Sequence, residues 1–276
     1  MSSSSPPDGP ATPRWSWPPA STRSPSTPAA PDFRLTVDAL DRARTPRTRA
    51  LVLANPGNPS GVLHNADEIR AIVGWCAVHD IHLVADEVYS QLTFDDAHVP
   101  AAAAAPEHRD RIITIGAVSK AHAMTGWRVG WLITTPERVA DARRHVAATI
   151  THVPGINQAA AVAALVDHST PTKARKAYRH RRDRLVAALK AIPGISCPSP
   201  GGGMFAFPDV TGLLAPGQTA ADLADHLLHT AHVATVPGDA FHGPGHLRLC
   251  FTVADHSLDK AITCLTRELT RIQGRS

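Results

Sequence analysis

The chain has 276 residues, 43% of them hydrophobic, which is enough for about two domains with substantial cores. Its formal net charge is +4, and its four cysteines are scattered without a Cys-x-x-Cys pair, as is typical of reduced, buried thiols. The sequence has no apolar run of about 18 residues and no signal-peptide pattern. These features exclude a small disulfide-stabilised protein. They predict a cytoplasmic protein with no membrane segment and no metal or redox chemistry.

Residues 1–31 form a tail that contains nine prolines and eight serines but no leucine, isoleucine, valine or phenylalanine. Such a segment buries too little apolar surface to offset the entropy of ordering the chain. The composition therefore predicts that this tail is disordered. Trp15 and Trp17 lie within it, and they are either a short docking motif or an incidental pair.

Strand and helix patterns alternate from Phe33 onward. Short apolar runs that end in turn residues predict buried strands, and these cover residues 50–54, 81–85, 111–115 and 129–134. The apolar spacing between the first two runs predicts a helix over 67–79. Strands that alternate with helices in this way predict an α/β fold with a mostly parallel sheet and helices on its faces.

The second half of the chain begins with helices. These are predicted over residues 137–148, 156–166 and 172–191, and Pro193-Gly194 ends the last of them. The remaining sequence predicts strands at 203–207, 233–236 and 246–252 and helices at 219–230 and 258–272. We therefore expect a larger α/β unit over 32–165 and a smaller C-terminal α/β domain over 166–276, connected by the long helix.

The densest basic run, from Lys173 to Arg184, is either a nucleic-acid-binding surface or the solvated side of a helix. On a helix these charges spread around the polar faces, and apolar residues remain for burial: Ala174, Ala177, Leu185 and Leu189. We therefore interpret the run as solvated and expect no nucleic-acid partner.

Three histidines, His226, His229 and His232, follow helical spacing, which metal ligands can also have. No acidic ligand pattern and no cysteine lies near them in the sequence. We therefore interpret them as a solvated helix face and predict no metal site.

Lysine is scarce, with five residues in the chain, and only Lys120 precedes residue 173. Lys120 directly follows a predicted strand, where α/β sheets place ligands, although taken alone it also fits an ordinary surface residue. Arg128 follows it between Gly126 and Gly130. Polar residues also follow two other predicted strands, in NPGNPSG at 55–61 and ADEVYS at 85–90. We expect these clusters at one edge of the sheet.

Five motifs in order resemble the fold-type-I pyridoxal-phosphate (PLP) aminotransferases of class I and II. They are NPGNPSGVL at 55–63, ADEVYS at 85–90, SKAHAMTGWRVG at 119–130, GGGMF at 201–205 and RLCF at 248–251. The resemblance extends from Phe33 to the last predicted helix. It implies that residues 32–165 are part of the PLP-binding large domain, with a partial, mostly parallel sheet, and that 166–276 are the small domain.

The resemblance also implies roles for single residues. Lys120 matches the lysine that binds PLP covalently and acts as general base at the substrate Cα. Asp86 matches the carboxylate that keeps the pyridine nitrogen protonated. Asn58 and Tyr89 match the groups that hydrogen-bond the phenolic oxygen of the ring. Arg128 matches the phosphate-binding arginine, whose planar fork suits phosphate oxygens.

Substrate and phosphate contacts complete the expected site. Arg248 matches the arginine that holds the substrate α-carboxylate, with Asn58 as a second candidate for substrate binding. Ser119 is a candidate phosphate ligand, because Ala117 stands where the family usually has serine or threonine, three residues before the lysine. Structural interpretations remain for each motif: Asp86 caps a loop, Arg248 is a surface residue, or Asn-Pro-Gly is only a turn.

The segment before the first motif departs from the family. Only 54 residues precede Asn55, whereas family members carry a much longer segment with a phosphate-binding glycine loop and an aromatic that stacks on the ring. Neither feature is found in this tail. We therefore expect an N-terminally truncated chain, or one that another chain completes.

The resemblance implies an aminotransferase that moves an amino group between an α-amino acid and a 2-oxo acid and that forms a homodimer. We expect its activity to be impaired by the missing part. Two alternatives stay open: a PLP-dependent carbon-sulfur lyase on the same fold, and a non-catalytic remnant that acts as a binding or regulatory protein. The particular amino acid is not readable from the sequence.

Overall fold

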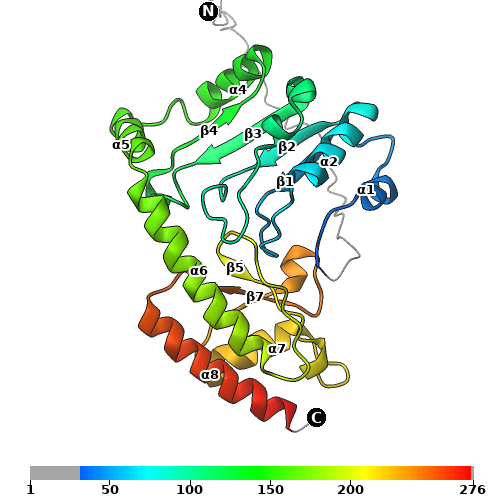
Figure 1. Ribbon diagram of the computed structural model, residues 1–276, viewed down its shortest axis with the longest axis vertical. Coiled ribbons are helices and arrows are strands. Elements are labelled where there is room, and N and C mark those ends of the chain that lie inside the picture. Colours follow the sequence, from blue (N-terminus) through cyan, green and yellow to red (C-terminus); the bar gives the residue numbers. More distant parts are fainter. Residues whose placement is uncertain (1–31, 275–276) are drawn as a thin grey trace, which may run out of the picture.

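The structure, a computed structural model, describes residues 32–274. The predicted disordered tail, including Trp15 and Trp17, lies outside the described residues. Two α/β units are arranged along the long axis of the molecule, and the helix α6 (Ser169–Lys190) runs from one to the other (Figure 1).

The larger sheet has four strands in the order β1 (Ala50–Ala54), β2 (His82–Asp86), β3 (Ile112–Ala117) and β4 (Gly130–Ile133). β1, β2 and β3 are parallel to one another, and β4 is antiparallel to β3. The prediction of an α/β fold with a mostly parallel sheet is confirmed. Because the strands are parallel, the loops after β1 and β2 leave the sheet at the same edge.

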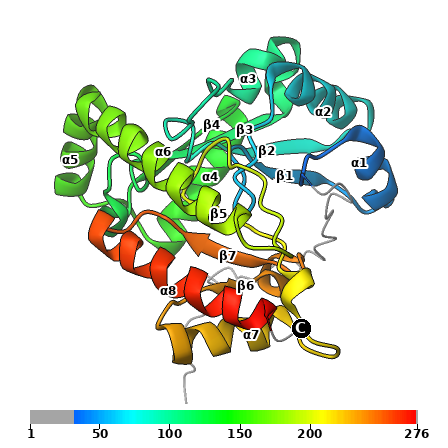
Figure 2. The same cartoon turned by 60° about the horizontal axis from the view of Figure 1, so that its bottom comes forward.

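Helices cover one face of this sheet. They are α1 (Val37–Ala43), α2 (Ala66–Val78) and the short α3 (Ala101–Ala104), which lie together in Figure 2. Asn65 caps α2 by accepting the backbone N–H groups of Asp67 and Glu68, and Glu68 in turn accepts from the backbone of Asn65. Helix α2 then buries Ile69 and Ile72 against the sheet.

The opposite face of the sheet is covered only in part by the described residues. Val52, Val84 and Ile113 are neighbours across β1, β2 and β3, and Val52 is 70% exposed. At one end of this face, Arg138 of α4 (Pro136–Thr149) lies 3.2 Å from a ring nitrogen of His82. The predicted helices at 137–148 and 156–166 correspond to α4 and to α5 (Gly155–Val166).

The predicted solvation of the basic run is wrong at Arg182, which is only 4% exposed. Its guanidinium donates to Asp95 Oδ2 at 2.6 Å and to the carbonyl of Pro200 at 2.9 Å. It also lies 4.9 Å from the ring centroid of Phe94. These partners compensate for the loss of water around the charge, so the arginine is part of the packing of α6 against the loops that contain Asp95 and Pro200.

The smaller unit contains a three-stranded antiparallel sheet in the order β5 (Phe205–Ala206), β7 (Leu247–Cys250), β6 (Val236–Pro237). Helix α7 (Ala220–His226) continues into a π-helical turn over Leu227–Ala231, so the predicted helix at 219–230 exists but changes its hydrogen bonding. The strand predicted at 233–236 overlaps β6 only at Val236. Helix α8 (Asp255–Gln273) closes the unit.

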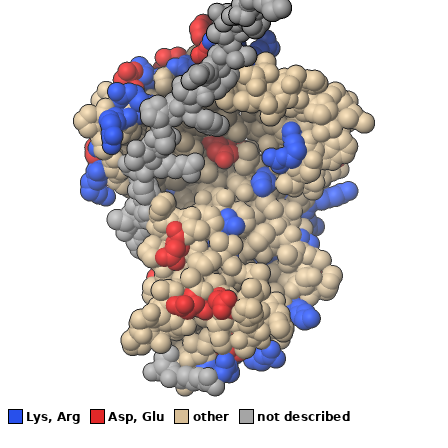
Figure 3. Space-filling model, turned by 180° about the vertical axis from the view of Figure 1, so that it is seen from behind, with Lys and Arg blue, Asp and Glu red and all other residues tan. Residues whose placement is uncertain are grey.

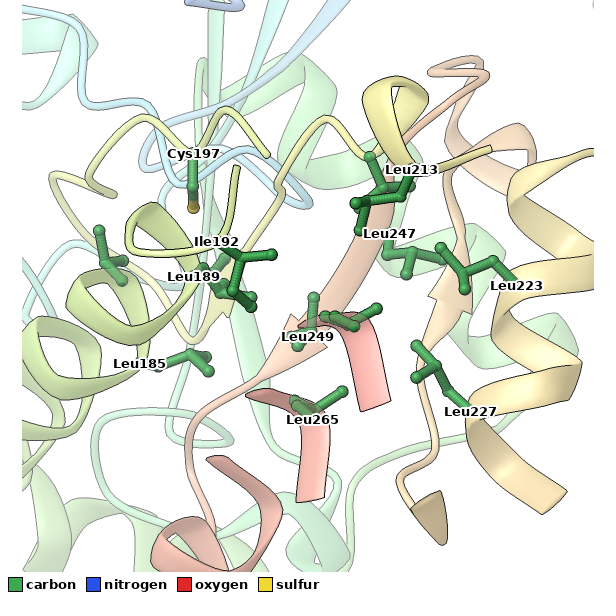
Figure 4. Close-up of a cluster of buried hydrophobic side chains, with 14 of the residues drawn as sticks. Leu185, Leu189, Ile192, Cys197, Leu213, Leu223, Leu227, Leu247, Leu249 and Leu265 are labelled. Atoms are coloured by element: carbon green, nitrogen blue, oxygen red, sulfur yellow. The ribbon is translucent and has the colours of Figure 1, made fainter. Parts of the chain in front are cut away.

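A leucine-rich core joins the elements of the smaller unit. Leu185 and Leu189 from α6 meet Leu223 from α7, Leu249 from β7 and Leu265 from α8 (Figure 4). Because α6 contributes to this core, the smaller unit is fixed to the helix that leads from the larger one. The domain boundary near residue 165 stays a prediction.

The histidines near the end of α7 have acidic neighbours. His226 Nε2 lies 2.6 Å from Glu268 Oε1, and His229 Nε2 lies 3.3 Å from Asp225 Oδ1. Within residues 32–274, no three histidine, cysteine, aspartate or glutamate side chains are grouped closely enough to hold a metal ion. In the same part of the chain, no helix has the length and apolarity needed to cross a membrane.

Candidate functional site

The residues singled out by the sequence lie between the two units. Asp86 ends β2, Lys120 follows β3, Asn58 is in the loop after β1, and Arg248 is in β7 of the smaller sheet. Figure 3 shows the side of the molecule opposite to Figure 1, where the surface is hollowed between the units and acidic and basic side chains lie around the hollow.

Asp86 is half-buried at the edge of the sheet. Its Oδ1 accepts the backbone N–H of Val88 at 3.2 Å, while its own carbonyl accepts the N–H of Asn55 at 3.0 Å. Among the described residues, no arginine, lysine or histidine forms an ion pair with its carboxylate. A half-buried carboxylate without a cation is costly, so this group is suited to a cationic ligand.

Lys120 and Tyr89 lie next to each other. The Lys120 Nζ is 5.8 Å from the centroid of the Tyr89 ring, which is consistent with a weak cation–π contact. In the part of the chain that the structure describes, the Lys120 amine has no carboxylate partner. Lys120 is half-buried, whereas Tyr89 is only 4% exposed. The buried ring of Tyr89 therefore lies beside a lysine amine that no described carboxylate neutralises.

The Tyr89 hydroxyl is surrounded by charged groups. Burial raises the pKa of Tyr89, the negative charge of Asp86 raises it further, and the positive charge of Arg248 lowers it. Because burial and Asp86 outweigh Arg248, the hydroxyl stays protonated at neutral pH. It can therefore act as a hydrogen-bond donor toward a ligand oxygen.

Arg248 is held by two aromatic rings and one amide. Its guanidinium carbon lies 4.4 Å from the ring centroids of both Phe205 and Phe241, and its Nη1 donates to Asn58 Oδ1 at 3.1 Å. The rings fix the plane of the guanidinium, and the remaining N–H groups have no other protein acceptor among the described residues. A planar oxyanion such as a carboxylate can accept those N–H groups.

The loop that carries Asn58 is fixed from both sides. Asn55 is buried, accepts the backbone N–H of His64 at 2.9 Å and donates to the carbonyl of His64 at 3.4 Å. Gly61 has a φ of +70°, and a Cβ there would lie 2.5 Å from the Cβ of Pro200. Only glycine fits this approach of the loop to the smaller unit. The sequence indicated Asn58 but not the structural role of Asn55.

Ser119 and Arg128 lie in the segment between β3 and β4, which also carries Lys120. Thr125 joins them, because its hydroxyl donates to the carbonyl of Ser119 at 3.3 Å and its carbonyl accepts from Arg128 Nη1 at 3.0 Å. Arg128 is exposed, and its backbone has the left-handed conformation, with a φ of 55°. Among the described residues, its guanidinium forms no hydrogen bond with another of the proposed site residues. The structure thus brings together Asn58, Asp86, Tyr89, Lys120 and Arg248, and it places Ser119 and Arg128 beside this cluster in sequence.

The sequence analysis did not identify Phe241 as a site residue, and it did not predict that the ring of Phe205 packs against Arg248. Phe241 belongs to a short turn, Gly238–Phe241, and its position over Arg248 depends on the packing of the smaller unit. Phe205 was part of a motif, but no periodicity assigns its ring to the face of an arginine. The only available signal was the scarcity of aromatic residues, which make up 5% of the chain.

Comparison with known proteins places these residues in a family context. The family model for aminotransferase class I and II matches residues 20–265. An aspartate aminotransferase of Streptomyces avermitilis is 33% identical over 248 residues, a match covering 86% of this chain and 60% of the relative. An arginine–pyruvate transaminase of Pseudomonas aeruginosa is 37% identical, covering 83% of this chain and 58% of the relative. The chain spans about three-fifths of the length of such curated relatives.

Solved structures agree with this assignment. A Thermus thermophilus aspartate aminotransferase double mutant superposes with a TM-score of 0.79 at 32% identity, covering 86% of this chain and 61% of the other. An aromatic aminotransferase from Pyrococcus horikoshii gives a TM-score of 0.82 at 31% identity, covering 87% and 65%. With the motif order, the sheet topology and a family match over most of its length, the chain belongs to the aminotransferase class I and II family.

Proposed function

We propose that this protein binds PLP and moves an amino group between an α-amino acid and a 2-oxo acid. One observation carries the proposal: a half-buried lysine amine and a half-buried aspartate carboxylate, neither in an ion pair with another described residue, both lie beside Tyr89 at one edge of the sheet. A ligand that carries an aldehyde and a basic ring nitrogen would satisfy both.

The residues present fit PLP by their chemistry. The carboxylate of Asp86 suits a protonated pyridine nitrogen, because no lysine, arginine or histidine of residues 32–274 forms an ion pair with it. The hydroxyl of Tyr89 and the amide of Asn58 suit the phenolic oxygen of the ring. Arg128 and Ser119 are the candidates for the phosphate. When bound, PLP supplies an electron sink for bonds broken at the substrate Cα.

Lys120 is the group that handles the proton at Cα. A lysine amine that has no carboxylate partner among the described residues would be available to hold the aldehyde of the cofactor and to take up the Cα proton as a general base. The neighbouring ring of Tyr89 restricts where the amine can go. Lys120 is therefore the proposed catalytic residue.

Arg248 orients the substrate. Its guanidinium is clamped between Phe205 and Phe241 and bonded to Asn58, so the direction of its free N–H groups is set before substrate arrives. The α-carboxylate common to all amino acids and 2-oxo acids pairs with this fork. This contact selects the substrate class rather than a side chain.

We also propose a homodimer, as the resemblance implies. Three apolar side chains of α5, namely Ile156, Val162 and Val166, are exposed in the single chain. Exposed apolar groups on one helix support an interface with another copy. Analytical ultracentrifugation of the full chain tests this state directly.

The proposed reaction is tested with an isotope. The full chain is incubated with PLP, ¹⁵N-labelled aspartate and 2-oxoglutarate, and ¹⁵N-glutamate is measured by mass spectrometry; a ¹⁵N-arginine and pyruvate pair is run in parallel. We expect label to move to the acceptor in at least one pair and to be lost in Lys120→Ala. Release of free ammonia and a thiol from a thioether amino acid, without transfer, would instead show a carbon-sulfur lyase.

A further inference from the structure

A cavity lies outside the proposed cofactor and substrate site. Its volume is about 320 Å³, and its lining consists of Ser90, Gln91, Thr93, Ala97, His98, His168, Pro171, Thr172 and Arg175. These residues come from the loop after Tyr89 and from the start of α6. None of the proposed PLP or substrate residues lines it.

His98 is a buried polar side chain with unused hydrogen-bonding capacity. Its side chain is only 5% exposed, and neither ring nitrogen forms a hydrogen bond in the structure. The Nε2 lies 3.4 Å from Glu87 Oε2, a separation that allows an ion pair with a protonated imidazole but is too long for a good hydrogen bond. A buried imidazole whose nitrogens form no hydrogen bond costs free energy.

The position of Glu87 leaves the cavity side of His98 open. Glu87 Oε1 already accepts the backbone N–H of Ala101 at 2.8 Å. His98 lines the cavity and Glu87 does not. Glu87 therefore offers His98 no hydrogen-bond acceptor on the cavity side, and an acceptor in the cavity completes the bonding of the imidazole.

The cavity lining is positive and rich in hydrogen-bond donors. It includes the Arg175 guanidinium, a second imidazole at His168 and the Ser90 hydroxyl, and it includes no acidic residue. The Thr172 hydroxyl also lines the cavity but already donates to the carbonyl of His168 at 2.8 Å. Among the described residues, Arg175 has no hydrogen-bond or ion-pair partner. Unlike most of the arginines of α6, it therefore has no internal charge to neutralise.

Two further carboxylates, next in sequence to the segments that line the cavity, already have partners. Asp167 caps the first turn of α6, where it accepts from the Ser169 backbone at 2.9 Å and from the Thr170 hydroxyl at 2.8 Å. Asp95 is bonded to Arg179 and Arg182. Because Asp167 already occupies the helix terminus, the positive character of the cavity comes from its own side chains and not from the α6 dipole.

We propose that this cavity is a binding site for an oxyanion, the carboxylate or phosphate group of a small metabolite, with His98 and Arg175 as its main ligands. The Arg175 guanidinium without a partner among the described residues, the buried imidazole without a hydrogen bond and the lack of acidic lining all point to the same ligand chemistry. The inference goes beyond the proposed amino-group transfer and does not depend on it. Through Ser90, the site adjoins Tyr89 without sharing residues with the proposed substrate site.

The test uses the full chain without PLP at pH 7 and constant ionic strength. Inorganic phosphate and malonate are titrated separately, and the imidazole signals of isotope-labelled histidine are followed by NMR, with His98 assigned from the spectrum of His98→Gln. We expect a saturable shift of the His98 signal with at least one probe. Arg175→Gln should weaken that binding by about tenfold, the effect of losing one charge-assisted pair.

Lys176→Gln is the matched control, because it removes the same charge from the next position of the same helix but does not line the cavity. It should leave the affinity unchanged, and so should Arg128→Gln, which removes the proposed cofactor-phosphate ligand. A response to phosphate alone or to malonate alone identifies the anionic group. The proposal is overturned if neither probe shifts His98 up to about 50 mM, or if Lys176→Gln weakens binding as much as Arg175→Gln.

Discussion

Arg248 in the smaller sheet donates a hydrogen bond from Nη1 to Oδ1 of Asn58, in the loop after the first strand of the larger sheet, at 3.1 Å. The two residues are far apart in the sequence, so the proposed substrate site exists only when both units are packed together. The same contact sets the direction of the arginine fork. Residues of both units therefore determine how a carboxylate would be held.

Replacing Arg248 should affect every substrate alike. We expect Arg248→Ala to weaken binding of all α-amino acids and 2-oxo acids by about 2–5 kcal/mol, because all share the α-carboxylate. Arg248→Lys should restore little, since a point charge cannot reproduce a planar fork clamped between two rings. The measurement is kcat/KM for a series of substrates. A loss confined to dicarboxylic substrates would show that Arg248 reads a side chain instead.

The charge of Asp86 should matter more for the reaction than for cofactor affinity. Asp86→Asn removes the carboxylate that suits a protonated ring nitrogen, so we expect single-turnover rates to fall far more than the affinity for PLP. Asp86→Glu, which keeps the charge, should be less harmful. Near-normal single-turnover rates in Asp86→Asn would assign the carboxylate a structural role only, as a partner of the Val88 backbone.

The four cysteines should differ in reactivity. Burial raises the pKa of Cys76 to about 12 and that of Cys197 to about 11, so almost no thiolate is present at neutral pH, whereas Cys250 is exposed. With a thiol reagent in the native protein, Cys250 should react first, and Cys76 and Cys197 should react only on unfolding. Peptide mapping after timed labelling checks this order. Early labelling of Cys76 would mean that the packing of α2 is looser than described.

Glu268 should contribute to acid stability. Hydrogen bonds from Arg271 and then from His226 lower its pKa to about 2 from an ordinary value of 4.5. A lowered carboxyl pKa stabilises the fold above the unfolded value, and this stability is lost as the pH falls from about 4.5 toward 2. We expect Glu268→Gln to cost about 1–3 kcal/mol at pH 7 and to flatten the pH dependence across that window.

Urea unfolding at several pH values measures the effect of Glu268→Gln. Asp225→Asn is a suitable control, because Asp225 of α7 also pairs with a histidine, His229, but both side chains of this pair are exposed. An exposed pair contributes little, so this variant should remain close to the wild type. Equal pH dependence in the wild type and Glu268→Gln would contradict the role of the Glu268 cluster.

Local patterns in the sequence predicted the strands, most helices and the edge of the sheet where the site lies. Lys120 and Asp86 were accessible to such reasoning because parallel strands bring their carboxyl ends to one edge, whatever the rest of the fold does. The antiparallel direction of β4 was not, since pairing direction depends on where the chain returns. Neither were α1 and α3, which are short and carry little periodicity.

Tertiary contacts explain the remaining differences. The burial of Arg182 depends on Asp95 and Pro200, which are distant in the sequence and compensate its charge together. The clamp on Arg248 depends on Phe241 from a turn whose position is set by packing. The sequence likewise does not predict that the ring nitrogens of His98 lack hydrogen bonds, because this depends on which acceptors the surrounding loops place near the imidazole.

The attachment of PLP to Lys120 tests the central claim most directly. The full chain is mixed with PLP, reduced with borohydride to fix any bond between a lysine amine and the cofactor, and digested for peptide mapping by mass spectrometry, with Lys120→Arg and Lys173→Arg treated in parallel. We predict that the label is found on Lys120, disappears in Lys120→Arg and is retained in Lys173→Arg. Label on Lys173 or Lys260 in place of Lys120, or no specific label at all, would contradict the proposed site.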